Sequence, residues 1–163
     1  EEQQAVAASP ENPLYRSQAG FLLGELAETI SEEDLRRAFR EVSLSALNES
    51  LMRNPHDIVA QMRKAEILRR AGRDEEARET LERLIAVEPN ALKAHLALAR
   101  MEEAGNPRKA ADLYKKAIAL ARELENGPVE ISQREFLRID LPEAERRLET
   151  LEKGLFVSRP GVQ

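Results

Sequence analysis

Histidine and cysteine are the residues from which a metal site or a nucleophile would be built, and the chain offers few of them. It has no cysteine and two histidines, His56 and His95. Neither histidine has a metal-ligating residue three or four positions further on, the spacing that places two ligands on one helix face. Without cysteine, the chain has no thiolate ligand, disulfide or cysteine nucleophile. The sequence therefore predicts no metal site and no cofactor.

Carboxylates are abundant, most of all in the segment DEEARETLE at residues 74–82. Two carboxylates can serve as general acid and base, but here the acidic residues have basic neighbours at helical spacing, as Glu82 has in Arg78. Such pairing is typical of a solvated helix face. No glycine-rich phosphate loop and no serine, histidine and acid motif is visible. We therefore predict that the chain is not an enzyme, and we assign no catalytic residue.

Composition restricts the classes of partner and of fold. The 25 basic and 30 acidic residues are interspersed and give a net charge of -5, so neither nucleic acid nor an anionic membrane surface is an expected partner. No apolar run approaches the roughly 18 residues of a membrane span, and no signal peptide is visible. Because the chain begins without methionine, we interpret its start as processed or truncated. Its compartment, cytoplasmic or extracytoplasmic, is left open.

The chain's 163 residues suffice for one domain or for a short array of small units. Aromatic residues are only 4% and alanine and leucine dominate the apolar residues, which favours helices. Apolar residues recur at helical spacing from Leu14 to Ile30 and again from Leu35 to Leu51. Ser31 is expected to cap the second of these helices, and Pro55 to end it. The pattern predicts a helical hairpin.

Downstream of this hairpin the sequence repeats itself at a period of 33 to 34 residues. The pairs that recur at this period are Pro55 with Pro89, Gly72 with Gly105, and Ala77 with Ala110. A period in the low thirties that contains two helices is typical of a helical repeat array. We expect each glycine to close a first helix in a left-handed conformation, and Asp74 and Asn106 to cap the second helices.

These residues give the chain a resemblance to the tetratricopeptide repeat family over residues 58–91 and 92–124. The matching residues are Ala65, Gly72, Ala77, Leu81 and Pro89 in the first copy, and Leu98, Ala99, Gly105, Ala110, Tyr114 and Ala117 in the second. Gln61 and His95 stand where the family often has tryptophan, so we expect His95 to be a packing residue. The resemblance implies an all-α fold in which antiparallel helix pairs form a right-handed superhelix.

The domain organisation follows from these repeats. We expect a disordered lead or linker at residues 1–12, a degenerate repeat or cap at 13–55, two repeats at 56–126, a degenerate repeat or capping helices at 127–155, and a flexible tail at 156–163. In the last helical segment, Asp140 followed by Glu143 indicates a helix start.

The resemblance also implies a concave groove lined by the first helix of each repeat. Carried over to this chain, the groove residues are Val59, Met62, Arg63, Glu66 and Arg70 in the first copy, and Lys93, Leu96, Ala97 and Arg100 in the second. The basic residues among them suit carboxylates of a peptide. Alternatively, they pair with their own acidic neighbours on a solvated face. Glu66 replaces an asparagine of the chaperone-binding members, which argues against that clamp.

Two functional hypotheses follow. The first is a non-catalytic module that binds a partner peptide or protein, including one with acidic groups, in the groove. The second is a structural assembly unit that self-associates as a homo-oligomer, or that forms the soluble part of a larger membrane or secretion complex.

Overall fold

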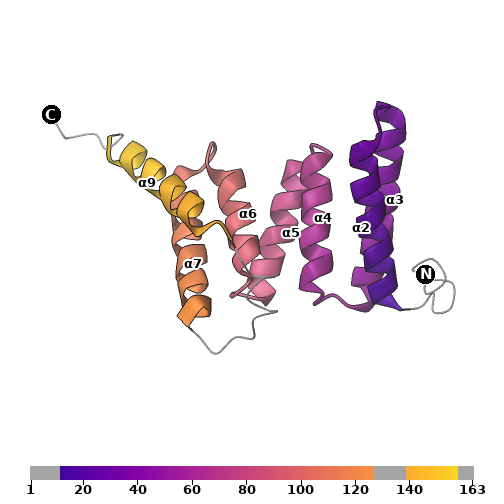
Figure 1. The fold of residues 1–163 in the computed structure, drawn as a ribbon, viewed down its shortest axis with the longest axis horizontal. Coiled ribbons are helices and arrows are strands. Elements are labelled where there is room, and N and C mark those ends of the chain that lie inside the picture. Colours follow the sequence, from indigo (N-terminus) through magenta and orange to yellow (C-terminus); the bar gives the residue numbers. More distant parts are fainter. Residues whose placement is uncertain (1–11, 127–138, 158–163) are drawn as a thin grey trace. The chain divides into compact units, whose positions relative to one another are not determined.

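The computed structural model describes residues 12–126 and 139–157, and within these ranges it contains helices and no strand. The helices are α2 (Pro13–Thr29), α3 (Glu33–Arg53), α4 (Ile58–Arg70), α5 (Asp74–Val87), α6 (Leu92–Glu102), α7 (Pro107–Asn126) and α9 (Leu141–Val157) (Figure 1). The expected all-α class is therefore confirmed. The segment GPVEISQREFLR, which we assigned to a degenerate repeat, and the expected lead before Asn12 lie outside the described residues.

The chain divides into two compact units, Glu1–Arg83 and Leu84–Gln163. The first unit contains α2, α3, α4 and most of α5. The second contains the end of α5 together with α6, α7 and α9.

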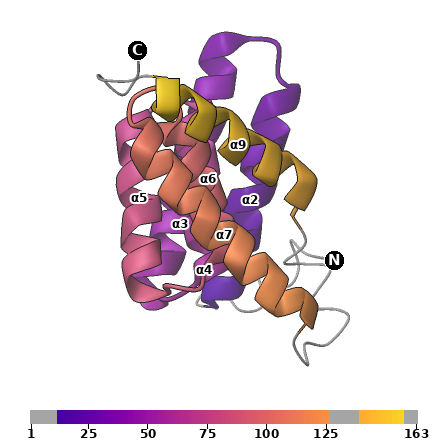
Figure 2. The ribbon, with the colours of Figure 1, turned by 90° about the vertical axis from the view of Figure 1, so that its left-hand side faces the viewer.

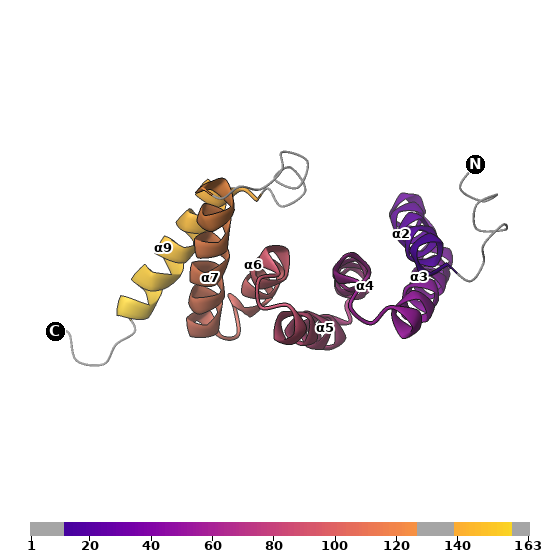
Figure 3. The ribbon, with the colours of Figure 1, turned by 90° about the horizontal axis from the view of Figure 1, so that it is seen from below.

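α2 and α3 form a hairpin (Figure 3), and two glycines of α2 lie where neighbouring helices approach closely. A Cβ at Gly20 would lie 2.9 Å from Cγ of Leu47, so the helices can approach this closely only without a side chain at this position. Ser43 Oγ donates a hydrogen bond of 2.5 Å to the carbonyl of Gly20 and ties the two helices together at the same place. Gly24, one turn further along α2, makes room for Ile67 of α4.

The helix starts show which residues are caps. Asn12, Asp57 and Asp140 accept hydrogen bonds from backbone N–H groups of the first turns of α2, α4 and α9, so the start expected at Asp140 is confirmed. The expected cap at Ser31 is wrong, because α3 begins at Glu33 and its N-cap Glu32 makes no side-chain capping bond. Asp74 is the first residue of α5 itself, where its negative charge interacts favourably with the helix dipole.

Gly72 closes α4 as predicted. Its φ of 72° is left-handed, and the N–H of Gly72 donates to the carbonyl of Arg69 at 3.0 Å while that of Arg73 donates to Leu68 at 2.9 Å. These two bonds form a Schellman motif. Gly105 differs, since its φ is not left-handed and α6 already ends at Glu102. The left-handed closure predicted for Gly105 is therefore wrong, whereas Asn106 does cap α7 through a bond from the N–H of Lys109.

In the second unit, α9 packs along α7, antiparallel to it (Figure 2). The core between them contains the fully buried Tyr114 and Ala117 of α7, Ala99 of α6 and the nearly buried Ala144 of α9. The small residues predicted to allow close helix approach, Ala65, Ala77, Ala99 and Ala110, are all buried. α9 ends at Val157, so helix continues two residues into the segment expected to be a flexible tail.

Candidate partner-binding face on α4

The predicted groove residues of the first copy share one helix. Val59, Met62, Arg63, Glu66 and Arg70 all lie on α4 and are partly exposed. Their neighbours come from α2, which lies beside α4 in the same unit. Those of the second copy lie on α6, in the other unit.

Arg63 is held by an aromatic ring. Its guanidinium carbon lies 4.2 Å from the centroid of the Phe21 ring on α2, a cation–π distance. Its Nη1 also makes a long hydrogen bond of 3.5 Å to the carbonyl of Ser17. No carboxylate pairs with Arg63 among the residues that the structure describes. Because stacking uses the face of the guanidinium, most of its N–H edge remains available to a ligand.

Arg70, two helical turns further along α4, already binds two carboxylates. Its Nε donates to Glu66 at 2.8 Å, and its Nη1 donates to Glu25 of α2, also at 2.8 Å. Glu66 in turn accepts two hydrogen bonds from Arg69. The result is a chain of alternating charges that joins α2 to α4.

The charges of this network change the acidity of Glu66. Partial burial raises the pKa of its carboxyl, but the hydrogen bonds from Arg69 and Arg70 more than offset this, and the net pKa lies below the usual 4.5. Glu66 is thus an anion that already accepts hydrogen bonds from two arginines. Its negative charge repels a ligand carboxylate, and its hydrogen bond positions Arg70.

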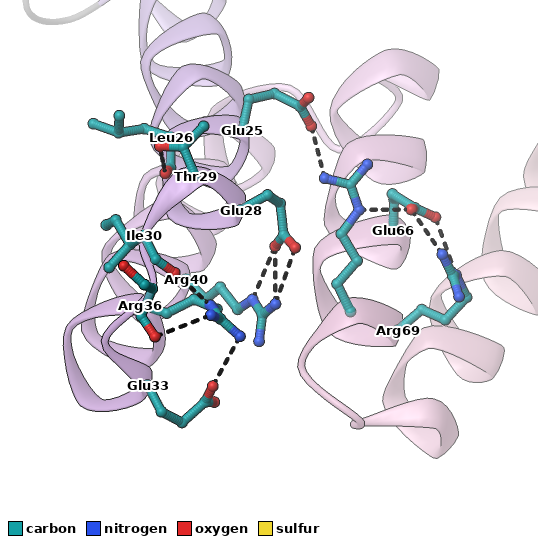
Figure 4. A network of polar contacts seen from close by, with 12 residues as sticks. Glu25, Leu26, Glu28, Thr29, Ile30, Glu33, Arg36, Arg40, Glu66 and Arg69 are labelled. Carbon is teal, nitrogen blue, oxygen red and sulfur yellow. Dashed lines mark hydrogen bonds and ion pairs between the residues drawn. The ribbon is translucent and has the colours of Figure 1, made fainter.

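A second group of polar contacts fixes the end of α2 against α3. Arg40 binds both carboxylate oxygens of Glu28, and Arg36 donates to the carbonyl of Ile30 at 2.9 Å (Figure 4). These bonds keep α2 in position, and α2 carries the groups that contact α4.

The predicted residues on α6 have different surroundings. Leu96 is buried at 7% exposure in a cluster that includes Ala144 of α9, so the structure places it in the core of the second unit. Arg100 is exposed but donates to Glu143 of α9 at 3.3 Å. Lys93 and Ala97 are partly exposed. α9 thus covers part of the face that the repeat pattern assigns to a partner.

Sequence reasoning missed the residues that surround these positions. Phe21 and Glu25 lie four apart on α2 and both face α4. On α9, Glu143 and Arg147 occupy the same spacing, and Arg147 donates to Glu103 of the α6 C-cap at 2.9 Å. The spacing of four was visible in the sequence, but the helix that each pair would face was not.

His95 behaves as a packing residue, as expected. It is 6% exposed, and its Nε2 lies 2.9 Å from the carbonyl oxygen of Pro89. Across the two described ranges no cluster of three or more histidine and acidic residues could hold a metal ion. No described helix is long and apolar enough to cross a membrane.

Two shallow depressions lie along the seam between α7 and α9, with volumes of about 390 and 300 Å³. Both are lined by Lys115 and Glu152, whose charged groups pair at 2.8 Å. Neither depression includes a predicted groove residue.

Known proteins with tetratricopeptide repeats resemble this chain in sequence and in fold. The family model of the tetratricopeptide repeat matches residues 30–101. Among solved structures, a thermophilic TPR protein of Thermus thermophilus is similar with a TM-score of 0.69 and 18% identity, over 89% of this chain and 70% of that one. The TPR2B domain of yeast Sti1, in its complex with pHsp70, is similar with a TM-score of 0.56 and 18% identity, over 82% of this chain and 98% of that one. None of the curated proteins matches the chain by sequence.

At these identities the solved structures show a shared fold of helix pairs, and the family match adds the repeat itself. Residues 30–101 thus match the tetratricopeptide repeat, and the chain shares the fold of known proteins built from this repeat.

Proposed function

We propose that the chain is a non-catalytic interaction module that binds a peptide or protein segment with acidic side chains on the face of α4. The observation that carries this proposal is the state of Arg63, which is stacked on Phe21 and has no carboxylate partner among the described residues. A guanidinium held in this way can receive a carboxylate through two parallel N–H bonds. The partly exposed Val59 and Met62 supply apolar contact beside it.

The repeat fold supports a protein or peptide as the partner. The similar Sti1 domain was solved as a complex with pHsp70, and we infer a ligand of the same broad kind here. In this proposal Arg70 and Glu66 position the helix and Arg63 makes the new contact. The positions Lys93, Ala97 and Arg100 form a second candidate face on α6, to be tested separately.

The test uses the immobilised chain and a library of short peptides that varies in charge. We expect acidic peptides to be enriched. Arg63→Ala should lower their affinity by about tenfold or more, because a hydrogen bond to a charged group contributes about 1.5–3 kcal/mol. Arg37→Ala is the control, since Arg37 is an exposed arginine on α3 with only a 4.0 Å contact to Asp34.

Two results would contradict the proposal. If the enriched peptides lacked acidic residues, a carboxylate would not be the group that the chain recognises. If acidic peptides bound Arg63→Ala as tightly as the wild type, Arg63 would not be part of the binding site. Circular dichroism of each variant shows whether the helices are retained.

A further inference from the structure

Lys64 of α4 is a lysine on the buried side of its helix. Its neighbours one turn away, Ala60, Ile67 and Leu68, are 0%, 4% and 1% exposed, whereas Lys64 itself is partly exposed. Residues three and four apart share one side of a helix, so the stem of Lys64 lies beside the core of the first unit. The side chain is therefore partly shielded from water and still reachable from it.

The acids around Lys64 are bound by an arginine. Glu76 is the acid whose charge acts on Lys64, but its two carboxylate oxygens accept hydrogen bonds of 2.6 and 2.7 Å from Arg73. Arg73 also donates to Glu41 of α3 at 3.1 Å. Within the part of the chain that the structure describes, no carboxylate bonds to Lys64. This cation is therefore left without a carboxylate of its own.

Other lysines of the chain have different surroundings. Lys109, Lys115 and Lys153 each form an ion pair with a glutamate. Lys116 lies exposed on α7. Lys64 thus differs from the paired lysines in lacking a carboxylate, and from Lys116 in being partly buried.

These surroundings favour the neutral amine of Lys64. Burial, followed by the charge of Arg83, lowers the pKa of the Lys64 ammonium group. Glu76 raises this pKa and Arg73 lowers it, both with smaller effects. At neutral pH a lowered pKa leaves more of a lysine unprotonated, and the unprotonated amine is the nucleophile.

Arg83 can bind an anion beside this amine. Its Nε donates to the carbonyl of Glu79 and its Nη2 to the carboxylate of the same residue, both at 3.3 Å. For Nη1 of Arg83 the described residues supply no acceptor, and the side chain is 71% exposed. Guanidinium N–H groups match the geometry of phosphate oxygens. A phosphate group bound to Arg83 would bring an attached electrophile toward Lys64.

We propose that Lys64 is a modification site, at which an acyl phosphate transfers its acyl group to the side-chain amine while Arg83 binds the phosphate. The amine nitrogen bonds to the carbonyl carbon, and the bond between this carbon and the phosphate oxygen breaks. Inorganic phosphate leaves with the electron pair and takes up a proton of the amine, so Lys64 becomes a neutral amide. This site goes beyond the proposed peptide binding, because Lys64 points about 100° away from Arg63 on the helix.

Incubation of the whole chain with acetyl phosphate near neutral pH tests the proposal, with mass spectrometry of each lysine as the measurement. We expect Lys64 to be acetylated several-fold faster than Lys116, the internal control. Arg83→Gln should slow the reaction of Lys64 several-fold and leave that of Lys116 unchanged. Arg37→Gln, which removes an exposed arginine of α3, should affect neither lysine.

A second reagent separates binding of the phosphate from activation of the amine. N-hydroxysuccinimidyl acetate carries the same acyl group without a phosphate, so Arg83→Gln should slow its reaction with Lys64 less. Acetylation of Lys64 no faster than that of Lys116 would overturn the proposal, as would an unchanged rate at Lys64 in Arg83→Gln. Equal slowing with both reagents would show that Arg83 does not bind the phosphate. Circular dichroism of each variant checks that the helices are retained.

Discussion

Arg63 of α4 stacks on Phe21 of α2, with 4.2 Å between the guanidinium carbon and the ring centroid. The two residues come from different helix pairs, so this contact holds in place a predicted groove cation for which the described residues supply no carboxylate. It links the stability of the first unit to its proposed binding face.

A double-mutant cycle measures this link. Phe21→Leu keeps an apolar side chain but removes the π face, and Arg63→Met removes the charge while keeping the stem. We expect a coupling free energy of about 0.5–1 kcal/mol in urea unfolding, the usual strength of an exposed cation–π contact. Additive effects of the two substitutions would show that the stacking contributes nothing in solution.

Glu66 gives the first unit a dependence on acid pH. Its pKa in the folded chain lies below 4.5, so its contribution to stability is present above about pH 4.5 and is lost as the pH falls through the lower folded value. Glu66→Gln should therefore be less stable than the wild type at pH 7, and the difference should shrink between pH 4.5 and pH 3.

Urea midpoints at pH 7, 4.5 and 3 provide the measurement. Asp34→Asn is the matched control, because the side chain of Asp34 is 90% exposed and lies 4.0 Å from Arg37. A difference between Glu66→Gln and the wild type that stays constant with pH would contradict the role given to this carboxylate.

The helices themselves could be predicted from sequence because their signals are local. Apolar spacing, Pro55 and the step from Gly72 to Gly105 located the hairpins, and Asp140 located the start of α9. Capping was less predictable, since a serine, aspartate or glycine near a helix end fits several geometries. Ser31 lies two residues before the first helical residue of α3, and Asp74 lies inside α5.

The surroundings of the candidate site could not be predicted in the same way. The stacking of Arg63 on Phe21 joins residues that no periodic pattern connects, and it depends on the close hairpin that Gly20 and Gly24 allow. The surroundings of Leu96 were not predicted either. The family register assigns it to the groove, but α9 folds back on α6 and α7 and buries it. A position in a repeat therefore predicts a helix face, and only the structure shows what covers that face.

The two turn glycines provide a paired prediction. Gly72→Ala should destabilise the chain by about 1–2 kcal/mol, because the residue must keep a φ of 72° and a side chain is disfavoured there. Gly105→Ala should be neutral or stabilising by up to about 1 kcal/mol, since its φ is not left-handed and a Cβ would meet nothing within 4 Å. Thermal unfolding of the two variants side by side is the test, and equal losses would contradict the different closures of α4 and α6.

Tyr114 connects the core of the second unit to its charges. The side chain is fully buried, and its hydroxyl donates to Oε1 of Glu103, which also accepts from Nη1 of Arg147 at 2.9 Å. Tyr114→Phe keeps the ring but removes this hydrogen bond. Because Glu103 retains Arg147, we expect a modest loss of about 1–2 kcal/mol in the free energy of unfolding.

The same substitution has an effect at alkaline pH. Burial, followed by the bond to Glu103, raises the pKa of the Tyr114 hydroxyl above its usual 10.0. Above pH 10 the unfolded chain therefore releases this proton while the folded chain keeps it, so the stability that Tyr114 provides is lost as the pH rises. Urea unfolding of the wild type and Tyr114→Phe at pH 8 and pH 11 should show the steeper alkaline loss in the wild type. Parallel losses would mean that Tyr114 ionises as readily in the folded chain as in the unfolded one.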